Sequence, residues 1–178
     1  MKGNQMESSV KMLKKISVDC LYGKKKHYNA ADRIHRYHNR LGVPLVILNV
    51  ISTSVLLFAI TQRTNTWGIY IPLCIALIAS VLSALQTFFK FNVRGDGHRR
   101  IADRYLAIMK KADRLLAYLQ DEVIDGKAFI ERLEVMAQEV EEINRDAGAF
   151  PTRDQDYELA QRGVEAGEES YNENEMGI

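Results

Sequence analysis

Two long segments in the middle of the chain contain no charged residue and consist mostly of apolar side chains. They cover residues 41–60 and 64–89, which are 20 and 26 residues long. A helix crosses the hydrocarbon core of a bilayer with about 20 apolar residues, whereas a helix on the surface of a soluble domain keeps a polar face. The pattern therefore predicts two transmembrane helices, at residues 41–60 and 67–89, joined by a loop at residues 61–66.

The distribution of charge predicts how this hairpin is oriented. Residues 1–40 carry ten Lys or Arg and three Asp or Glu, and residues 90–114 carry eight and three. Between the two apolar runs the one basic residue is Arg63. Two spans make the chain a multi-pass membrane protein, and basic residues close to membrane-spanning segments stay in the cytoplasm. Both termini should be cytoplasmic, and residues 61–66 should lie outside.

The segments on either side of the hairpin have apolar positions three or four residues apart, as helices do. Residues 1–40 are expected to form amphipathic helices, with a break around residues 23–26. We interpret Arg94–His98, with its two glycines, as the turn that leads from the second span into the next helix. Residues 90–147 are then expected to form a cytoplasmic helical hairpin that turns at Ile124–Gly126.

The second helix of this cytoplasmic hairpin carries a heptad-like seam of apolar side chains, which is typical of coiled coils. The seam consists of Phe129, Leu133, Met136, Val140 and Ile143. It is expected to pack against other helices, within one subunit or between subunits. Residues 148–178 are predicted to be an irregular acidic tail with a short helix around residues 157–162. Residues 115–178 have a net charge of −12, so an acidic layer is expected further from the membrane than the basic segments. The basic segments are explained by their position next to the membrane, and no nucleic acid is expected as a partner.

Residues that could catalyse a reaction or bind a metal are sparse. Asp32, His35 and His38 could place three zinc ligands on one helical face, but a fourth ligand is missing nearby. We interpret them as a polar face against lipid headgroups. No Ser or Cys lies in a nucleophile motif, and the glycines of Arg94–His98 do not follow a strand, as those of a phosphate-binding loop would. The sequence therefore predicts no enzyme, no metal site and no cofactor.

The two spans contain no Asp, Glu, Lys, Arg or His, which argues against an ion-coupled transporter. In the second span, small and hydroxyl side chains that allow close helix packing in lipid share one face: Pro72, Ala76, Ser80, Ser83 and Thr87. In the first span, polar side chains near mid-depth are followed by apolar ones: Asn49, Ser52, Thr53, Leu56 and Ile60. Two interpretations remain open, which are packing inside a single hairpin and a ring of hairpins around a pore lined by this second set.

Several patches along the chain together carry a resemblance to a known family. They are HYNAADRIHRYHNRLGVPLVILNVISTSVLLFAI, the second apolar run, HRRIADRYLAIMKKADRLL and FPTRDQDYELA, all within residues 17–163. In these patches the chain resembles the SLATT family, two-transmembrane effector domains named for their association with nucleotidyltransferase (SMODS) and SLOG proteins in bacterial conflict systems. The resemblance implies a membrane effector that acts on a nucleotide signal, and it supplies no catalytic residues.

Two functions are consistent with these patterns in an all-α, oligomeric membrane protein. The first is a pore-forming effector of antiviral defence, which depolarises the bacterial inner membrane and arrests growth or kills the cell by abortive infection. Its partners would be the lipid bilayer, other copies of the chain, and a nucleotidyltransferase or nucleotide-sensing protein. The alternative is a non-conducting membrane anchor or adaptor that docks a soluble partner through its cytoplasmic helices. The polar side chains of Asn49, Ser52 and Thr53 favour the pore.

Overall fold

The computed structural model describes the backbone of residues 2–61 and 67–169, and the side chains of residues 6–61 and 69–169. These residues form α1 (Lys2–Thr61), α2 (Trp67–Phe89), α3 (Phe91–Gln120), α4 (Gly126–Ala147) and α5 (Asp154–Glu165). The all-α fold predicted from the sequence is confirmed. The predicted loop at residues 61–66, apart from Thr61, and the end of the predicted tail, residues 170–178, lie outside the described residues.

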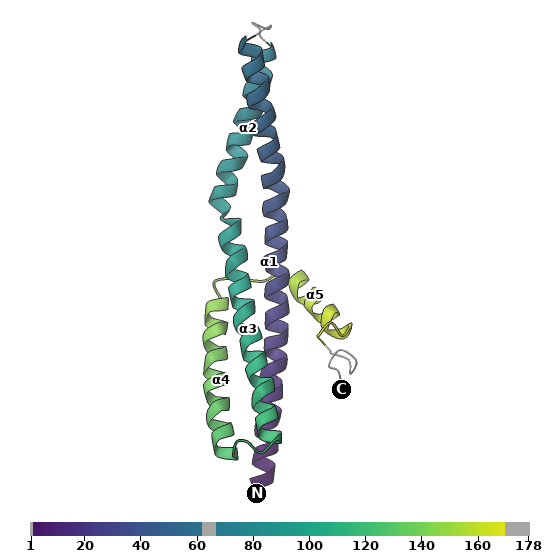
Figure 1. Cartoon of the computed structure of the whole chain (residues 1–178), viewed down its shortest axis with the longest axis vertical. Helices are drawn as coiled ribbons and strands as arrows, with labels where there is room; N and C mark the ends of the chain where they lie inside the picture. Colours follow the sequence, from purple (N-terminus) through teal and green to yellow (C-terminus); the bar gives the residue numbers. More distant parts are fainter. Residues whose placement is uncertain (1, 62–66, 170–178) are drawn as a thin grey trace. The chain divides into compact units, whose positions relative to one another are not determined.

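The chain divides into two compact units, which we call the hairpin unit and the bundle unit. The hairpin unit is Asp32–Gly95, and in it α2 lies alongside the second half of α1 (Figure 1). The bundle unit consists of Met1–Ala31 and Asp96–Ile178. Within the bundle unit α4 lies alongside α3, and α5 follows an extended connection from the end of α4 (Figure 1).

The apolar helices of the hairpin unit leave most of their side chains uncovered. Two helical stretches, Met6–Thr61 and Ile69–Gln120, each contain an apolar segment long enough to cross a membrane. Only 17% of the first apolar segment and 11% of the second are buried. An apolar helix in the core of a soluble domain would instead be covered by its neighbours. The exposed apolar surface of this hairpin therefore matches a lipid environment better than water.

Small side chains and two polar contacts join the helices of the hairpin unit. Ala59 and Ala79 are fully buried, so the two backbones can approach closely. The Ser52 hydroxyl donates a hydrogen bond of 2.6 Å to the carbonyl oxygen of Pro72. Nearer the other end, the Gln86 amide donates a hydrogen bond of 3.2 Å to the carbonyl oxygen of His38. The hairpin thus satisfies part of its polar groups between its own helices.

The bundle unit has a continuous apolar core built from three helices. α1 contributes Leu13 and Cys20, and the larger share comes from α3 and α4: Ile101, Tyr105, Ile108, Ala112, Leu115, Phe129, Leu133, Met136 and Ile143. The predicted seam of α4 is therefore packed inside one chain, with Val140 partly buried beside it. Burial of each large apolar side chain stabilises such a core by about 1.5–3 kcal/mol.

Two glycine-containing segments that the sequence analysis assigned to a break and a turn are helical in the structure. α1 continues through residues 23–26, where Gly23 lies so close to the ring of Tyr105 that a Cβ would stand 3.0 Å from it. Arg94–His98 belongs to α3, and Gly97 makes room for the ring of Phe150. The actual break between α2 and α3 is Lys90, whose φ is 47°. Gly23 and Gly97 therefore allow close packing of aromatic rings against the helices, and neither of them provides a turn.

The end of the chain contains more helix than the predicted irregular tail. α5 begins at Asp154, and the Asp156 carboxylate accepts a hydrogen bond of 2.9 Å from the backbone N–H of Arg153. This contact satisfies a backbone donor at the start of the helix. At the turn predicted for Ile124–Gly126, α3 has already ended at Gln120, and Asp125 caps α4 by accepting from the N–H of Ala128 at 2.8 Å.

Candidate functional site

An open groove with polar walls lies on the surface of the hairpin unit. It has a volume of about 700 Å³ and is lined by one residue of α1, Asn49, and by residues of α2: Ala79, Ser80, Ser83, Ala84, Thr87 and Phe88. Asn49, Ser80, Ser83 and Thr87 are all exposed. Polar side chains from both helices thus meet in one place on an otherwise apolar surface.

The hydroxyl groups of this unit differ in whether they have a partner. Thr53, Ser54 and Thr87 donate to carbonyl oxygens four residues earlier in their own helices, at 2.8, 2.8 and 3.1 Å. Helices in lipid commonly satisfy Ser and Thr in this way. Within the part of the chain that the structure describes, the Asn49 amide and the Ser80 and Ser83 hydroxyls have no such partner. The groove therefore brings together three uncharged polar side chains that have no hydrogen-bond partner among the described residues.

The predicted pore-lining residues are distributed over different environments. Asn49 lies in the groove, and Thr53 is exposed and bonded to the Asn49 carbonyl. Ser52 is buried and faces α2, where it contacts Pro72. Leu56 is half-buried, and Ile60 is exposed. The structure therefore brings Asn49 together with polar side chains of α2, and Ser52 together with a backbone carbonyl of the same helix.

The predicted helix-packing residues of α2 also fall into two groups. Pro72 is buried, Ala76 is half-buried, and both are on the side that faces α1. Ser80, Ser83 and Thr87 are exposed and line the groove, while Ala79, which the sequence analysis did not single out, is buried in the contact with α1. The small-residue face is therefore only partly used within one chain.

Gln86 is a contact residue that the sequence analysis missed. Its amide reaches the His38 side chain and backbone, both at 3.2 Å, and a Cβ on Gly42 would stand 2.9 Å from the amide nitrogen. A lone Gln within an apolar run, opposite a Gly, is a signal that could have indicated this contact, because an amide in lipid needs a partner. The contact also gives His38 a role in the hairpin that does not involve a metal.

The remaining candidates for metal binding, Asp32 and His35, have different surroundings. Asp32 is exposed, and His35 packs against Gly95, where an added Cβ would stand 3.0 Å from the ring. Among the described residues, no group of three or more His, Cys, Asp or Glu could hold a metal ion.

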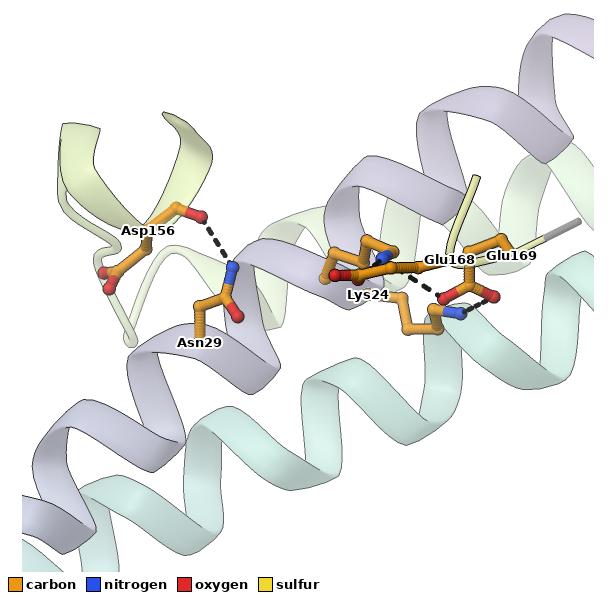
Figure 2. A network of polar contacts seen from close by, with 6 residues as sticks. Lys24, Asn29, Asp156, Glu168 and Glu169 are labelled. Atoms are coloured by element: carbon orange, nitrogen blue, oxygen red, sulfur yellow. Dashed lines mark hydrogen bonds and ion pairs between the residues drawn. The ribbon is translucent and has the colours of Figure 1, made fainter. Parts of the chain in front are cut away.

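The bundle unit contains a network of charged and polar contacts between α1 and the segment formed by α5 and the turn after it (Figure 2). Lys24 forms an ion pair of 2.7 Å with Glu169, and Lys25 pairs with Glu168 and, at 3.6 Å, with Glu169. One helical turn away, the Asn29 amide donates a hydrogen bond of 3.0 Å to the backbone carbonyl of Asp156 (Figure 2). The network fixes α5 and the following turn to the first half of α1.

A pair of buried histidines lies next to this network. The Nδ1 atoms of His27 in α1 and His98 in α3 are 3.0 Å apart. Burial, followed by the nearby charges of His98 and Lys26, lowers the pKa of His27 from 6.5 to about 4, while Asp156 acts in the opposite direction. His27 is therefore neutral at pH 7, so the pair can share one hydrogen bond without repulsion. Burial likewise raises the pKa of the Cys20 thiol to about 12, which makes it a poor nucleophile.

These features define an all-helical membrane protein, which combines an apolar hairpin that carries a polar groove with a helical bundle in which a charged network joins α5 and the following turn to α1. A family model for the SMODS and SLOG-associating 2TM effector domain family 4 matches residues 11–175. The chain belongs to this family, as its sequence patches suggested. Neither the curated proteins nor the solved structures contain a match to the chain.

Proposed function

We propose that the protein is an oligomeric pore-forming effector of the bacterial inner membrane, which acts in a nucleotide-signalled defence system against phage. Membership of a family of two-transmembrane effector domains associated with SMODS and SLOG proteins supports this role. Opening of the pore would depolarise the membrane and stop growth or kill the infected cell. A nucleotidyltransferase or a nucleotide-sensing protein would supply the trigger.

The observation that carries this proposal is the group of unpaired polar side chains in the groove of the hairpin unit. Asn49, Ser80 and Ser83 are exposed between apolar side chains of α1 and α2. In lipid, a polar group without a partner costs free energy, so it must meet another helix or water. Association of several hairpins through this groove would provide both kinds of partner. Part of the groove would contact a helix of a neighbouring copy, and the surface next to it would line an aqueous path.

The proposed arrangement follows from the number of helices. Two helices cannot enclose water, whereas a ring of hairpins can. Asn49 and Thr53 are one turn apart on α1, so the copies of each residue would form a polar ring around the axis, one ring above the other. Leu56 and Ile60 follow toward the outer side, where apolar side chains can exclude water and hold a pore closed. Both termini would be in the cytoplasm, as the clusters of basic residues at the inner ends of the spans indicate.

A surface groove in the bundle unit favours a second candidate function, a non-conducting adaptor. This groove has a volume of about 350 Å³, lies between α3 and α4, and has apolar walls that include Leu115, Val135 and Met136. Charged residues surround it, among them Lys111 and Glu139. A soluble partner could dock there, and the hairpin would then serve only as an anchor.

Measurement of membrane potential in cells distinguishes the two functions. Induced or triggered wild-type protein should depolarise the membrane, as a potential-sensitive dye reports, whereas Asn49→Leu should insert normally and fail to depolarise. Val50→Leu is the matched control, because Val50 is an exposed apolar neighbour on the same helix. Leu56→Ser should leak without a trigger, since it places a hydroxyl in the apolar constriction. Equal depolarisation by Asn49→Leu and wild type would remove the argument for a pore lined by this residue.

A further inference from the structure

Lys24 and Lys25 are unusual for lysines because both are almost entirely covered. Their side chains are 7% and 10% exposed, and they lie side by side on α1 in the bundle unit. A buried ammonium group is costly unless an anion is close to it. Two of them in adjacent positions therefore form a site that requires negative charge.

In this structure the negative charge comes from the turn that follows α5. Gly167 adopts a φ of 78°, and the Glu168 backbone N–H donates to the Gly163 carbonyl at 3.1 Å, so the chain reverses direction directly after the helix. The reversal brings Glu168 and Glu169 onto the lysines (Figure 2). The Glu168 carboxylate lies directly against Gly163, in the space that a Cβ would occupy at this position.

The lysines and the glutamates of this contact differ in how far they are exposed to solvent. The lysines belong to a long helix in the core of the bundle unit, whereas the Glu168 side chain is 64% exposed and that of Glu169 is 32% exposed. Both carboxylates keep contact with water, whereas the ammonium groups are covered. Departure of the carboxylates alone would leave buried positive charge without a partner, but exchange for another anion would keep the ammonium groups paired.

Space for another anion exists beside the ammonium groups. A pocket of about 230 Å³ is lined by both lysines and both glutamates, and also by Tyr28, Asn29 and Leu159. A phosphate group carries close to two negative charges at neutral pH and offers three oxygen acceptors. Two adjacent ammonium groups match that charge, and lysine is a common ligand of phosphate.

We propose that Lys24 and Lys25 form a binding site for a phosphate-bearing anion, and that Glu168 and Glu169 occupy this site when the anion is absent. The anion would be either a free phosphate compound or the headgroup of an anionic lipid, since both present the same group. Binding would displace the turn at residues 166–169 from α1. The proposal concerns the bundle unit alone and is independent of whether the hairpin conducts.

Titration of the purified full-length protein with inorganic pyrophosphate tests the proposal in neutral detergent. Calorimetry should detect binding to wild type, and the double variant Glu168→Gln/Glu169→Gln should bind about tenfold more tightly, because the competing carboxylates are gone. Pyrophosphate should also raise the Tm of that variant more than the Tm of wild type, because it then supplies the missing negative charge. If Glu168 and Glu169 formed only structural ion pairs, the double variant would show neither tighter binding of pyrophosphate nor a larger rise in Tm.

The matched control uses a second lysine pair on the same helix. Lys24→Gln/Lys25→Gln should abolish binding, whereas Lys14→Gln/Lys15→Gln, which changes an exposed pair by the same charge, should leave it intact. A parallel arm compares retention of phosphatidic acid with that of phosphatidylcholine by native mass spectrometry. Retention that follows the same variants assigns a lipid headgroup, and pyrophosphate binding without such retention assigns a free phosphate compound. Binding that survives Lys24→Gln/Lys25→Gln, or no gain in the glutamine variant, would overturn the proposal.

Discussion

Acidification should loosen the bundle unit, because His27 is buried in a neutral form. Its pKa is 6.5 in an unfolded chain and about 4 in the folded protein, with burial as the main cause and with His98 and Lys26 adding to it against Asp156. Between these two values the unfolded chain binds the proton more tightly than the folded protein does. Stability is therefore fully present above pH 6.5, and it falls as the pH decreases toward 4.

The size of this effect follows from the difference between the two pKa values. A difference of about 2.5 units corresponds to roughly 3 kcal/mol once the pH is below both values, and to about 2 kcal/mol near pH 5. About 2 kcal/mol is roughly a thirtyfold change in the population of the opened bundle. This is a large part of the stability of an ordinary domain, so the change is well within reach of measurement.

Hydrogen–deuterium exchange of the full-length protein in detergent measures this change. The amides of α3 next to His98 should lose protection by roughly thirtyfold near pH 5 relative to pH 7, after correction for the intrinsic exchange rate. His27→Gln, which cannot titrate, should lose most of this pH dependence. His38→Gln should retain it, because His38 contacts Gln86 in the hairpin unit. Identical pH dependence in wild type and His27→Gln would refute the assignment.

Three further predictions concern the membrane hairpin. A Thr64→Cys variant without the native cysteines should react with an impermeant thiol reagent on intact cells; labelling only after permeabilisation would reverse the orientation. Ser80→Leu should weaken assembly in membranes more than Ile78→Leu does, as cross-linking would measure, because it adds bulk where helices approach closely; equal effects would contradict this packing. Ser52→Ala should destabilise the hairpin by about 0.6 kcal/mol in a detergent unfolding titration, whereas Ser54→Ala, which loses only a bond within its own helix, should have little effect.

The positions of the helices could be predicted from the sequence because simple physical limits set them. The two uncharged runs are long enough to cross a bilayer, and α2 covers the predicted span at residues 67–89. The seam from Phe129 to Ile143 has the spacing of one helical face, and that face is buried in the bundle. In both cases a periodic pattern over many residues carries the information, so no single contact had to be known.

Contacts that depend on helix rotation or on distant residues could not be predicted. Asn49 and Ser52 are close in sequence, but Ser52 is buried against the carbonyl of Pro72 while Asn49 is exposed in the groove, and this difference depends on the rotation of α1 against α2. Gly97 suggested a turn, although it is needed for the approach of Phe150 from another segment. The lysines at positions 24 and 25 suggested a break in the helix, and their partners Glu168 and Glu169 are more than 140 residues away.

Conductance of the purified oligomer in planar bilayers tests the central claim most directly. The protein should be reconstituted with its trigger, or as the Leu56→Ser variant that is expected to be open without one. We predict discrete conductance steps that Asn49→Leu abolishes and Val50→Leu preserves. If the oligomer never conducts in either form, even with its partner protein and that partner's product present, the pore is contradicted and the hairpin is an anchor.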